Sequence, residues 1–348
     1  MIEIIYFSSG DFGVPTLNEL ITDCKSNIRV RGVVTSKDKV HFNDERIFDI
    51  ASKNDIPCII PNNDDELQKF LNDVGKVDLY CVISYKKLSN RILSLVNGNA
   101  INIHASVLPF LRGAAPINWA IRLGFKQTGL TAFKLSDKID QGDILKYEIT
   151  DIYETDNYET LFKRLSAMCT KFAPTAIVSY MEKVKNNTLE ELWQQINIGV
   201  KNHLLNAPKV THPDYWSTWD CMTEEEINNL YKSTTDGLHG VLKVYHRTSY
   251  DVNFNPTYSI KIWDYEFVKY DWKWENRGFV HSDGKNYLYV PINHKGSLAR
   301  TVPRGFALSI KELQVEGRKR MSIEEFLRGF KYFRKDDYLI DIASPHKE

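Results

Sequence analysis

An amide, an imidazole and a carboxylate occur at spacings that could bring them to one place. Asn102 and His104 stand two residues apart in a short apolar segment, and Asp140 opens the later segment 140–143. Side chains two residues apart on a β-strand point to the same face, so Asn102 and His104 are expected to point together. These three groups suit transfer of a one-carbon acyl unit to an amine, because they can stabilise an oxyanion and move protons.

The elements around Asn102 predict the sheet that must position it. Apolar segments typical of strands alternate with amphipathic segments typical of helices. Strands are predicted at 2–7, 30–35, 57–60, 77–84 and 98–104, and helices at 14–23, 43–53 and 64–71. This alternation predicts an α/β fold with a doubly wound, mostly parallel sheet. Such sheets bind ligands outside the carboxyl ends of their strands, which is where His104 lies.

Two loops could complete a site beside this strand. Segment 112–115 begins with Arg112, and its small residues would let the backbone approach a ligand closely at the start of the next helix. In the second loop, Gly142 permits a tight turn that could swing Asp140 back over the strand ends. The elements predicted around these loops are a helix at 116–123, strands at 129–135 and 144–149, and a long helix at 158–183.

Each of these features has a common structural explanation when it is taken alone. An Asn-x-His pair is usually the polar end of a core strand, and an Asp-x-Gly-Asp sequence is usually a turn. A loop of small residues is often only the entry to a helix. Their occurrence together, in this order and on one predicted sheet, favours an active site.

Composition restricts the class of protein. The 348 residues are enough for two domains with buried cores, and no apolar run is long enough to span a bilayer. Met1 leads almost directly into a predicted strand, so we expect no signal peptide and a cytoplasmic location. The five cysteines are scattered and form no Cys-x-x-Cys pair, which favours buried thiols over a disulfide frame or a zinc site.

The alternation of predicted strands and helices gives way to a run of short predicted strands, and this change predicts a second domain. We place the first domain at 1–190, a partly helical linker at 191–209 and the second domain at 210–348. Thr223 with Glu226, and Ser322 with Glu325, resemble capping boxes that begin helices ending near 232 and 332. Strands are predicted at 239–246, 258–270, 276–280, 287–291 and 307–315. This set of short strands suits a small, OB-like β-barrel with Greek-key connections.

Basic residues are concentrated in one segment of the second domain, 296–335, although the whole chain has a net charge of zero. Between 296 and 335 the acidic residues are Glu312, Glu316, Glu324 and Glu325. The basic residues of the same segment are Arg300, Arg304, Lys311, Arg318, Lys319, Arg320, Arg328, Lys331, Arg334 and Lys335. A basic face on a small barrel could follow an RNA backbone. On charge alone, a solvated surface without a ligand is an equally good interpretation.

Several segments resemble the folate-dependent formyltransferases, and in particular the methionyl-tRNA formyltransferases. They include Ile-His-Ala-Ser-Val-Leu-Pro at 103–109 and Ile-Asp-Gln-Gly-Asp-Ile-Leu at 139–145. The other resembling segments are 5–15, 113–120, 128–131, 312–322 and 325–329. They follow one another in the order of that family, and the similarity is weak only at 36–46 and 240–280. The resemblance implies a Rossmann-like formyltransferase domain followed by an OB-like barrel.

The resemblance also implies a site and a reaction. Asn102, His104 and Asp140 would be catalytic, with Asn102 and His104 on the oxyanion and Asp140 orienting His104. The formyl donor would be 10-formyltetrahydrofolate, held by the backbone of 84–88 and of the Asp140 loop and by Ser106, Val107, Leu108 and Pro109. The α-amino group of initiator methionyl-tRNA would attack the formyl carbon directly. The residues expected to contact this substrate are Arg112, Arg318, Lys319 and Arg320. No metal and no membrane partner are expected, and we expect a monomer acting in translation initiation.

Departures from the family pattern leave the acceptor open. Segment 36–43 is shorter and less basic than the loop with which the family commonly approaches the tRNA acceptor end. It favours a second possibility with the same chemistry, an N-formyltransferase acting on a nucleotide-linked amino sugar. The closing segment from Arg318 to Gly329 favours tRNA. A non-catalytic RNA-binding protein is a further alternative, although such a protein has no need of Asn102, His104 and Asp140.

Overall fold

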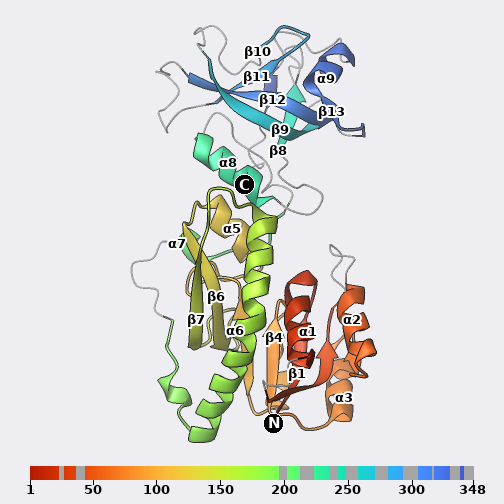
Figure 1. The fold of residues 1–348 in the computed structure, drawn as a ribbon, viewed down its shortest axis with the longest axis vertical. Coiled ribbons are helices and arrows are strands. Elements are labelled where there is room, and N and C mark those ends of the chain that lie inside the picture. Colours follow the sequence, from red (N-terminus) through yellow and green to blue (C-terminus); the bar gives the residue numbers. More distant parts are fainter. Residues whose placement is uncertain are drawn as a thin grey trace, which may run out of the picture. The chain divides into compact units, whose positions relative to one another are not determined.

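The computed structural model describes residues 1–22, 27–36, 44–195, 202–211, 223–234, 242–247, 258–270, 281–292, 305–315, 317–329 and 338–340. Contacts divide the chain into two units, one made of Met1–Ala120 with Phe125–Lys209 and the other of Val210–Glu348 with Ile121–Gly124. Each unit has its own sheet (Figure 1). Each also has its own core of buried apolar side chains. The segment expected to be a linker, 191–209, contributes to the first unit. The division into 1–190, 191–209 and 210–348 stays a prediction.

The sheet of the first unit has the strand order β3-β2-β1-β4-β5-β6-β7. Its strands are β1 (Ile2–Ser8), β2 (Ile28–Val34), β3 (Cys58–Ile59), β4 (Leu79–Ile83), β5 (Ala100–His104), β6 (Gln127–Lys134) and β7 (Ile144–Asp151). Neighbouring strands from β3 to β5 in this order are parallel, which confirms the mostly parallel α/β sheet. Strands β6 and β7 are antiparallel to their neighbours, which the sequence pattern did not predict. Residues 135–143 join these two strands and are too few for a parallel crossover, which needs about a dozen residues or more.

Helices cover both faces of this sheet (Figure 1). They are α1 (Val14–Thr22), α2 (Asp44–Lys53), α3 (Asp64–Val74), α4 (Asn90–Ser94), α5 (Pro116–Arg122), α6 (Tyr158–Asn186) and α7 (Asn202–Leu205), with the 3₁₀ helices η1 (Asp11–Gly13) and η2 (Leu189–Glu191). Leu67 of α3 and Ile92 of α4 share a core cluster with Phe7 of β1. The next residue back, Tyr6, points to the other face and lies beside Cys169 of α6. The sheet is therefore doubly wound.

Capping residues and a helical spacing of apolar residues explain why α3 and α6 form where they do. The Asn63 side chain accepts a hydrogen bond from the Glu66 N–H at the start of α3. At the start of α6, Asn157 and Thr160 form a capping box. The buried residues of α6, among them Leu161, Leu165, Cys169, Phe172 and Ala176, recur every three or four positions and so form one face. That face packs along α1 and against β5 and β6.

An antiparallel sheet forms the second unit, in the order β10-β11-β12-β9-β8-β14, with β13 paired to β12. Its elements are α8 (Glu224–Ser233), β8 (Leu242–Arg247), β9 (Tyr258–Tyr270), β10 (His281–Ser282), β11 (Leu288–Ile292), β12 (Gly305–Val315), β13 (Met321–Ser322), α9 (Ile323–Gly329) and β14 (Tyr338–Ile340). Four of the expected strands fall on β8, β9, β11 and β12. The strand expected at 276–280 lies outside the described residues. Both expected capping boxes are present, at Thr223 with Glu226 and at Ser322 with Glu325.

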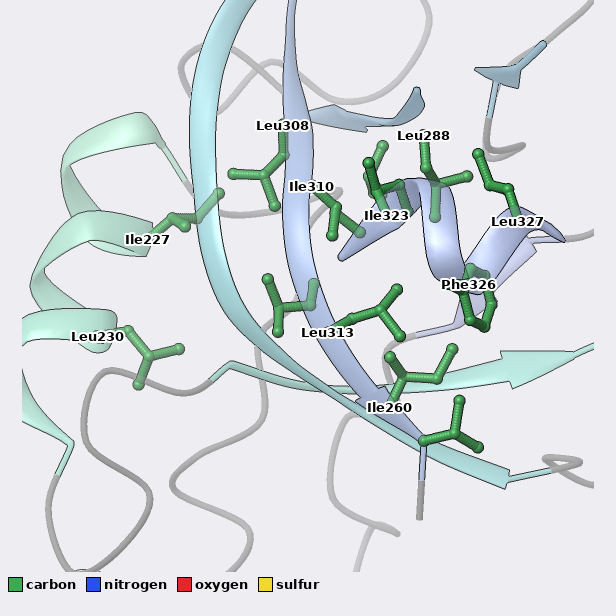
Figure 2. Close-up of a cluster of buried hydrophobic side chains, with 13 residues drawn as sticks. Ile227, Leu230, Ile260, Leu288, Leu308, Ile310, Leu313, Ile323, Phe326 and Leu327 are labelled. Atoms are coloured by element: carbon green, nitrogen blue, oxygen red, sulfur yellow. The ribbon is translucent and has the colours of Figure 1, made fainter. Parts of the chain in front are cut away.

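Side chains from the two helices and the strands meet in one core cluster in the second unit (Figure 2). Ile227 and Leu230 come from α8, while Ile323 and Phe326 come from α9. The two longest strands, β9 and β12, pair with register shifts around Glu312. Bulges of this kind bend and twist a strand pair, and both strands curve in Figure 2. No helix in the described parts of either unit has the length and apolar character to cross a membrane.

Candidate active site

Strand β5 presents Asn102 and His104 on one face of the first sheet. Asn102 lies between Val82 of β4 and Phe133 of β6, and His104 pairs with Thr131. The intervening residue Ile103 is buried on the opposite face. Asn102 is half-buried, and within the described parts of the chain its amide makes no hydrogen bond. This strand therefore offers an unused amide and an imidazole side by side.

The imidazole of His104 is held by a loop that folds back over the end of β5. Its Nε2 lies 2.8 Å from the carbonyl oxygen of Leu111, and the residue is only 6% exposed. Because a carbonyl oxygen can only accept, Nε2 carries a hydrogen and donates it. Nδ1 faces the carboxylate of Asp140, at 3.7 Å from Oδ2. Nδ1 is therefore the nitrogen that can exchange a proton beside a carboxylate.

Asp140 reaches His104 from the loop between β6 and β7. Its backbone has a φ of 51°, in the left-handed region that Asp and Asn tolerate better than most residues. Its Oδ2 accepts a hydrogen bond of 2.8 Å from the N–H of Gly113. The expectation that Gly142 supplies the turn needs correction, since the left-handed residue is Asp140 itself. Gly142 is required for close packing instead, because a Cβ there would overlap the carbonyl oxygen of Lys134.

The four residues expected to bind the folate lie in the loop directly after His104. The hydroxyl of Thr131 donates to the Ser106 carbonyl at 2.7 Å and accepts from the Leu108 N–H at 3.0 Å. Ser106 is 1% exposed, and its hydroxyl donates to the Phe110 carbonyl at 2.6 Å. The hydroxyl hydrogen is therefore already bonded within the loop. Leu108 is also buried, whereas Val107 and Pro109 are half-buried. The role of Ser106, Val107, Leu108 and Pro109 in binding stays a prediction.

The two backbone segments expected to hold the pterin ring are tied to each other. Lys87, in the loop after β4, donates from Nζ to the carbonyl of Asp137 at 2.5 Å. Asp137 belongs to the same loop as Asp140. Ser84 has a φ of 53°, and its carbonyl accepts from the Ser9 N–H at 2.8 Å. These contacts place the loops after β1, β4 and β6 next to one another.

Arg112 also lies beside these loops, and it is bound by Gln195, a residue that the sequence did not single out. The Oε1 of Gln195 accepts from Arg112 Nε at 2.9 Å and from Nη2 at 2.6 Å. Burial lowers the pKa of the Arg112 guanidinium, and the nearby Asp140 carboxylate opposes that shift. Gln195 lies in the segment taken for a linker and belongs to no motif, so no local signal marks it. The contact joins residues 83 positions apart.

The basic residues Arg318, Lys319 and Arg320 lie in the second unit, at the turn between β12 and β13. Arg320 forms an ion pair with Glu312, and its guanidinium carbon is 4.9 Å from the centre of the Trp263 ring. All three basic residues are exposed, and Arg320 differs in having these contacts within its own unit. Of the other basic residues counted between 296 and 335, Arg300, Arg304, Lys331, Arg334 and Lys335 lie outside the described residues.

The described thiols are poorly suited to act as nucleophiles. Burial raises the pKa of Cys169 and of Cys58 to about 12, so the thiolate form is scarce near neutral pH. Within the described residues, no group of three or more His, Cys, Asp or Glu side chains is arranged to hold a metal ion. The groups of this site that can form hydrogen bonds or transfer protons include Asn102, His104 and Asp140.

A Gly113→Ala substitution is expected to be destabilising and to lower activity. Gly113 has a φ of 120°, and a Cβ there would lie 2.6 Å from the carbonyl oxygen of Ala207. A residue forced into such backbone costs about 1–3 kcal/mol before the clash is counted. Gly98→Ala is the control, because Gly98 has a φ of 73° with nothing within 4 Å of its Cβ position. Chemical denaturation should show the larger loss for Gly113→Ala, and equal losses would contradict the predicted clash.

Comparisons with known proteins define the class. Residues 2–177 match the family described as formyl transferase, which is half of the chain, so the chain belongs to the formyl transferase family. The expectation of a formyltransferase is thereby confirmed.

Curated relatives carry a more particular name, methionyl-tRNA formyltransferase. One, from Bacillus thuringiensis, is 30% identical over 344 residues, covering 95% of this chain and 96% of the relative. Another, from Bacteroides thetaiotaomicron, is 28% identical with the same coverage of both chains.

Solved structures of low sequence identity share the fold. A sugar 3N-formyl transferase, determined with dTDP and 5-N-formyl-THF, is 16% identical with a TM-score of 0.54, covering 92% of this chain and 99% of that one. An N-formyltransferase from Helicobacter canadensis, in complex with folinic acid and dTDP-3-aminofucose, is 16% identical with a TM-score of 0.55. It covers 89% of this chain and 99% of its own. At this identity the likeness concerns the fold alone.

Proposed function

We propose that this chain transfers the formyl group of 10-formyltetrahydrofolate to the α-amino group of initiator methionyl-tRNA. The observation that carries the proposal is the unused amide of Asn102 beside the His104–Asp140 pair. It lies in a chain that aligns over 95% of its length with methionyl-tRNA formyltransferases. The proposal gives every group of this cluster a role in one reaction.

The residues around β5 fit a carbonyl-bearing folate donor. A half-buried amide whose hydrogen-bonding capacity is unused within the described residues suits a carbonyl oxygen. The half-buried Val107 and Pro109 offer apolar surface for a ring, and the backbone of 84–88 and of the loop carrying Asp140 offers polar groups to its edge. When bound, the donor supplies the formyl group. The chain itself supplies the orientation and the proton transfers.

Asn102, His104 and Asp140 have different roles at the reacting carbon. The Asn102 amide donates a hydrogen bond to the reacting carbonyl oxygen, and the positive charge that His104 acquires on protonation stabilises the negative charge developing there. His104 accepts the proton that the attacking amine gives up, at Nδ1, and returns it to the departing nitrogen. The Asp140 carboxylate, 3.7 Å from that nitrogen, stabilises the imidazolium while it holds the proton. The amine attacks directly, so no protein nucleophile takes part.

The second unit is proposed to be an OB-like barrel that orients the tRNA. Its antiparallel sheet, its bulged long strands and its exposed Arg318 and Lys319 support this role. Arg112, beside Asp140 in the first unit, is proposed to contact the acceptor near the reacting amine. We further propose that the enzyme is a cytoplasmic monomer.

Neutralising the exposed bases should change how binding depends on salt. We expect the double variant Arg318→Gln with Lys319→Gln to bind methionyl-tRNA more weakly, with a salt slope smaller by about 1 for each phosphate that is no longer neutralised. The control removes equal charge from the same unit, through Lys269→Gln with Lys285→Gln, at two other exposed lysines. Arg320→Gln should mainly reduce stability, because it breaks the contacts with Glu312 and Trp263. An unchanged slope for the first variant would place the RNA contacts elsewhere.

The proposed acceptor is tested by product analysis. Purified protein is incubated with 10-formyltetrahydrofolate and methionyl-tRNA, and in parallel with a panel of nucleotide-linked amino sugars. The proposal expects N-formylmethionine to be released from the tRNA after mild alkaline hydrolysis. Product found only on a sugar would keep the formyl transfer chemistry and overturn the acceptor.

A further inference from the structure

The side-chain amide of Gln195 makes as many hydrogen bonds as its two N–H groups and two lone pairs allow. Its Oε1 accepts from two nitrogens of Arg112, at 2.9 and 2.6 Å. Its Nε2 donates to the carbonyls of Asp140, at 3.0 Å, and of Gly142, at 2.8 Å. One side chain thus holds both carbonyls that bracket Gln141, in the loop that carries the Asp140 carboxylate.

The backbone next to Gln195 is fixed on the sheet. Trp193 and Ile144 exchange two backbone hydrogen bonds, of 2.8 and 2.9 Å, so this segment pairs with the start of β7. The Trp193 ring also lies against Tyr147 of β7, with ring centres 5.9 Å apart. Gln195 follows two residues later, and its half-buried side chain therefore extends from an anchored position. The neighbouring Gln194 is exposed, and its side chain makes no hydrogen bond to any described residue.

Two loops of the site are linked twice, once directly and once through Gln195. Directly, the Gly113 N–H donates to Asp140 Oδ2 at 2.8 Å. Indirectly, Arg112 is joined through the Gln195 amide to the Asp140 backbone. Asp140 occupies the left-handed region, at a φ of 51°, where a non-glycine residue needs support from its surroundings. The hydrogen bond from Gln195 to the Asp140 carbonyl provides that support on the same residue whose carboxylate faces His104.

We propose that Gln195 is a positioning residue, which holds the Asp140 carboxylate at its working distance from His104 and keeps Arg112 beside it. The inference deepens the proposed function, since it concerns the same reaction. The side-chain hydrogen bonds of Gln195 go to Arg112, Asp140 and Gly142, and none goes to His104 among the described residues. The effect of Gln195 on the chemical step passes through Asp140.

Four single variants test this role. Gln195→Ala should lower kcat by about 10- to 100-fold, the effect of an ångström-scale misplacement. KM for 10-formyltetrahydrofolate should be nearly unchanged, while KM for the acceptor should rise, because Arg112 loses the oxygen that holds it. Gln195→Glu keeps the acceptor for Arg112 and loses the donors to Asp140 and Gly142. It should therefore lose at least as much kcat as Gln195→Ala. Gln194→Ala and Gln194→Glu are the matched controls and should remain at the activity of the unmodified enzyme.

A double-mutant cycle separates positioning from a general effect on folding. In an Asp140→Asn background there is no carboxylate to position, so adding Gln195→Ala should change the single-turnover rate by less than about 2-fold. A full, additive loss in that background would overturn the proposal, as would a Gln195→Glu enzyme with normal kcat. A loss confined to the melting temperature, with normal kcat for the folded enzyme, would also overturn it.

The outcome is distinguishable from failure of the proposed acceptor. If the unmodified enzyme formylates only an amino sugar, the acceptor is wrong and the same series is run on that sugar, with the same losses expected. If the unmodified enzyme formylates methionyl-tRNA and Gln195→Ala is as active, the proposed function stands and the role of Gln195 is refuted.

Discussion

A His104→Gln enzyme is expected to keep its fold and lose formyl transfer, with kcat/KM reduced by about 100- to 10,000-fold, the usual contribution of a general acid–base group. The glutamine amide can still donate a hydrogen bond to the Leu111 carbonyl, which the imidazole Nε2 makes at 2.8 Å. It cannot take up a proton from the amine and return it to the departing nitrogen. The variant therefore separates the structural role of His104 from its chemical role.

His104→Ala completes this comparison. It should be as inactive as His104→Gln and less stable, because it removes a buried ring and leaves the Leu111 carbonyl without its donor. Folate binding, measured by calorimetry or fluorescence, should remain measurable in both variants, since neither change removes the proposed ring-binding segments. Steady-state rates with methionyl-tRNA provide the activity readout. Near-normal turnover in both variants would refute the proposed proton transfer.

The second large effect is expected at Asp140, where two substitutions separate charge from geometry. Asp140→Asn keeps an acceptor for the Gly113 N–H and a residue that tolerates the left-handed backbone. It removes only the negative charge beside His104 Nδ1. We expect kcat to fall by about 100- to 1,000-fold, as when a group that stabilises charge in the transition state is removed.

Asp140→Ala should lose at least as much activity and also reduce stability. An alanine in the left-handed region costs about 1–2 kcal/mol, and the Gly113 N–H loses its acceptor. Melting temperatures should therefore follow the order wild type, Asp140→Asn, Asp140→Ala, while the two variants share most of the loss in kcat. An Asp140→Asn enzyme with normal kcat would show that the charge is not needed, and the assignment of Asp140 would fail.

Local patterns explain how much of the site could be predicted from sequence. Asn102 and His104 share a face because side chains alternate along a strand, which depends only on their spacing. The capping residues Thr223 and Asn157 likewise act within four residues. The approach of Asp140 to His104 joins residues 36 positions apart. The turn residues around Gly142 suggested that Asp140 could return over the strand ends, and the resemblance to known formyltransferases supported it.

Contacts between distant segments set the limits of the prediction. Gln195 reaches the site through hydrogen bonds to residues 53, 55 and 83 positions away, so nothing in its own neighbourhood could reveal it. The antiparallel pairing of β6 with β5 depends on how the chain returns after α5, which strand periodicity does not encode. The antiparallel pairing of β7 with β6, by contrast, follows from the short connection 135–143. The ion pair of Arg320 with Glu312 depends on the pairing of β12 with β13, so it could not be predicted from the sequence either.

The most direct test of the account is the specificity constant for formyl transfer to initiator methionyl-tRNA, measured beside that for a dTDP-linked amino sugar at the same concentration of 10-formyltetrahydrofolate. His104→Gln serves as the blank for both acceptors. The proposed function predicts a kcat/KM for the tRNA at least about 100-fold above that for the sugar, a ratio of the size that one or two well-placed recognition contacts provide. A higher value for the sugar, or equal rates for the unmodified and His104→Gln enzymes on the tRNA, would contradict it.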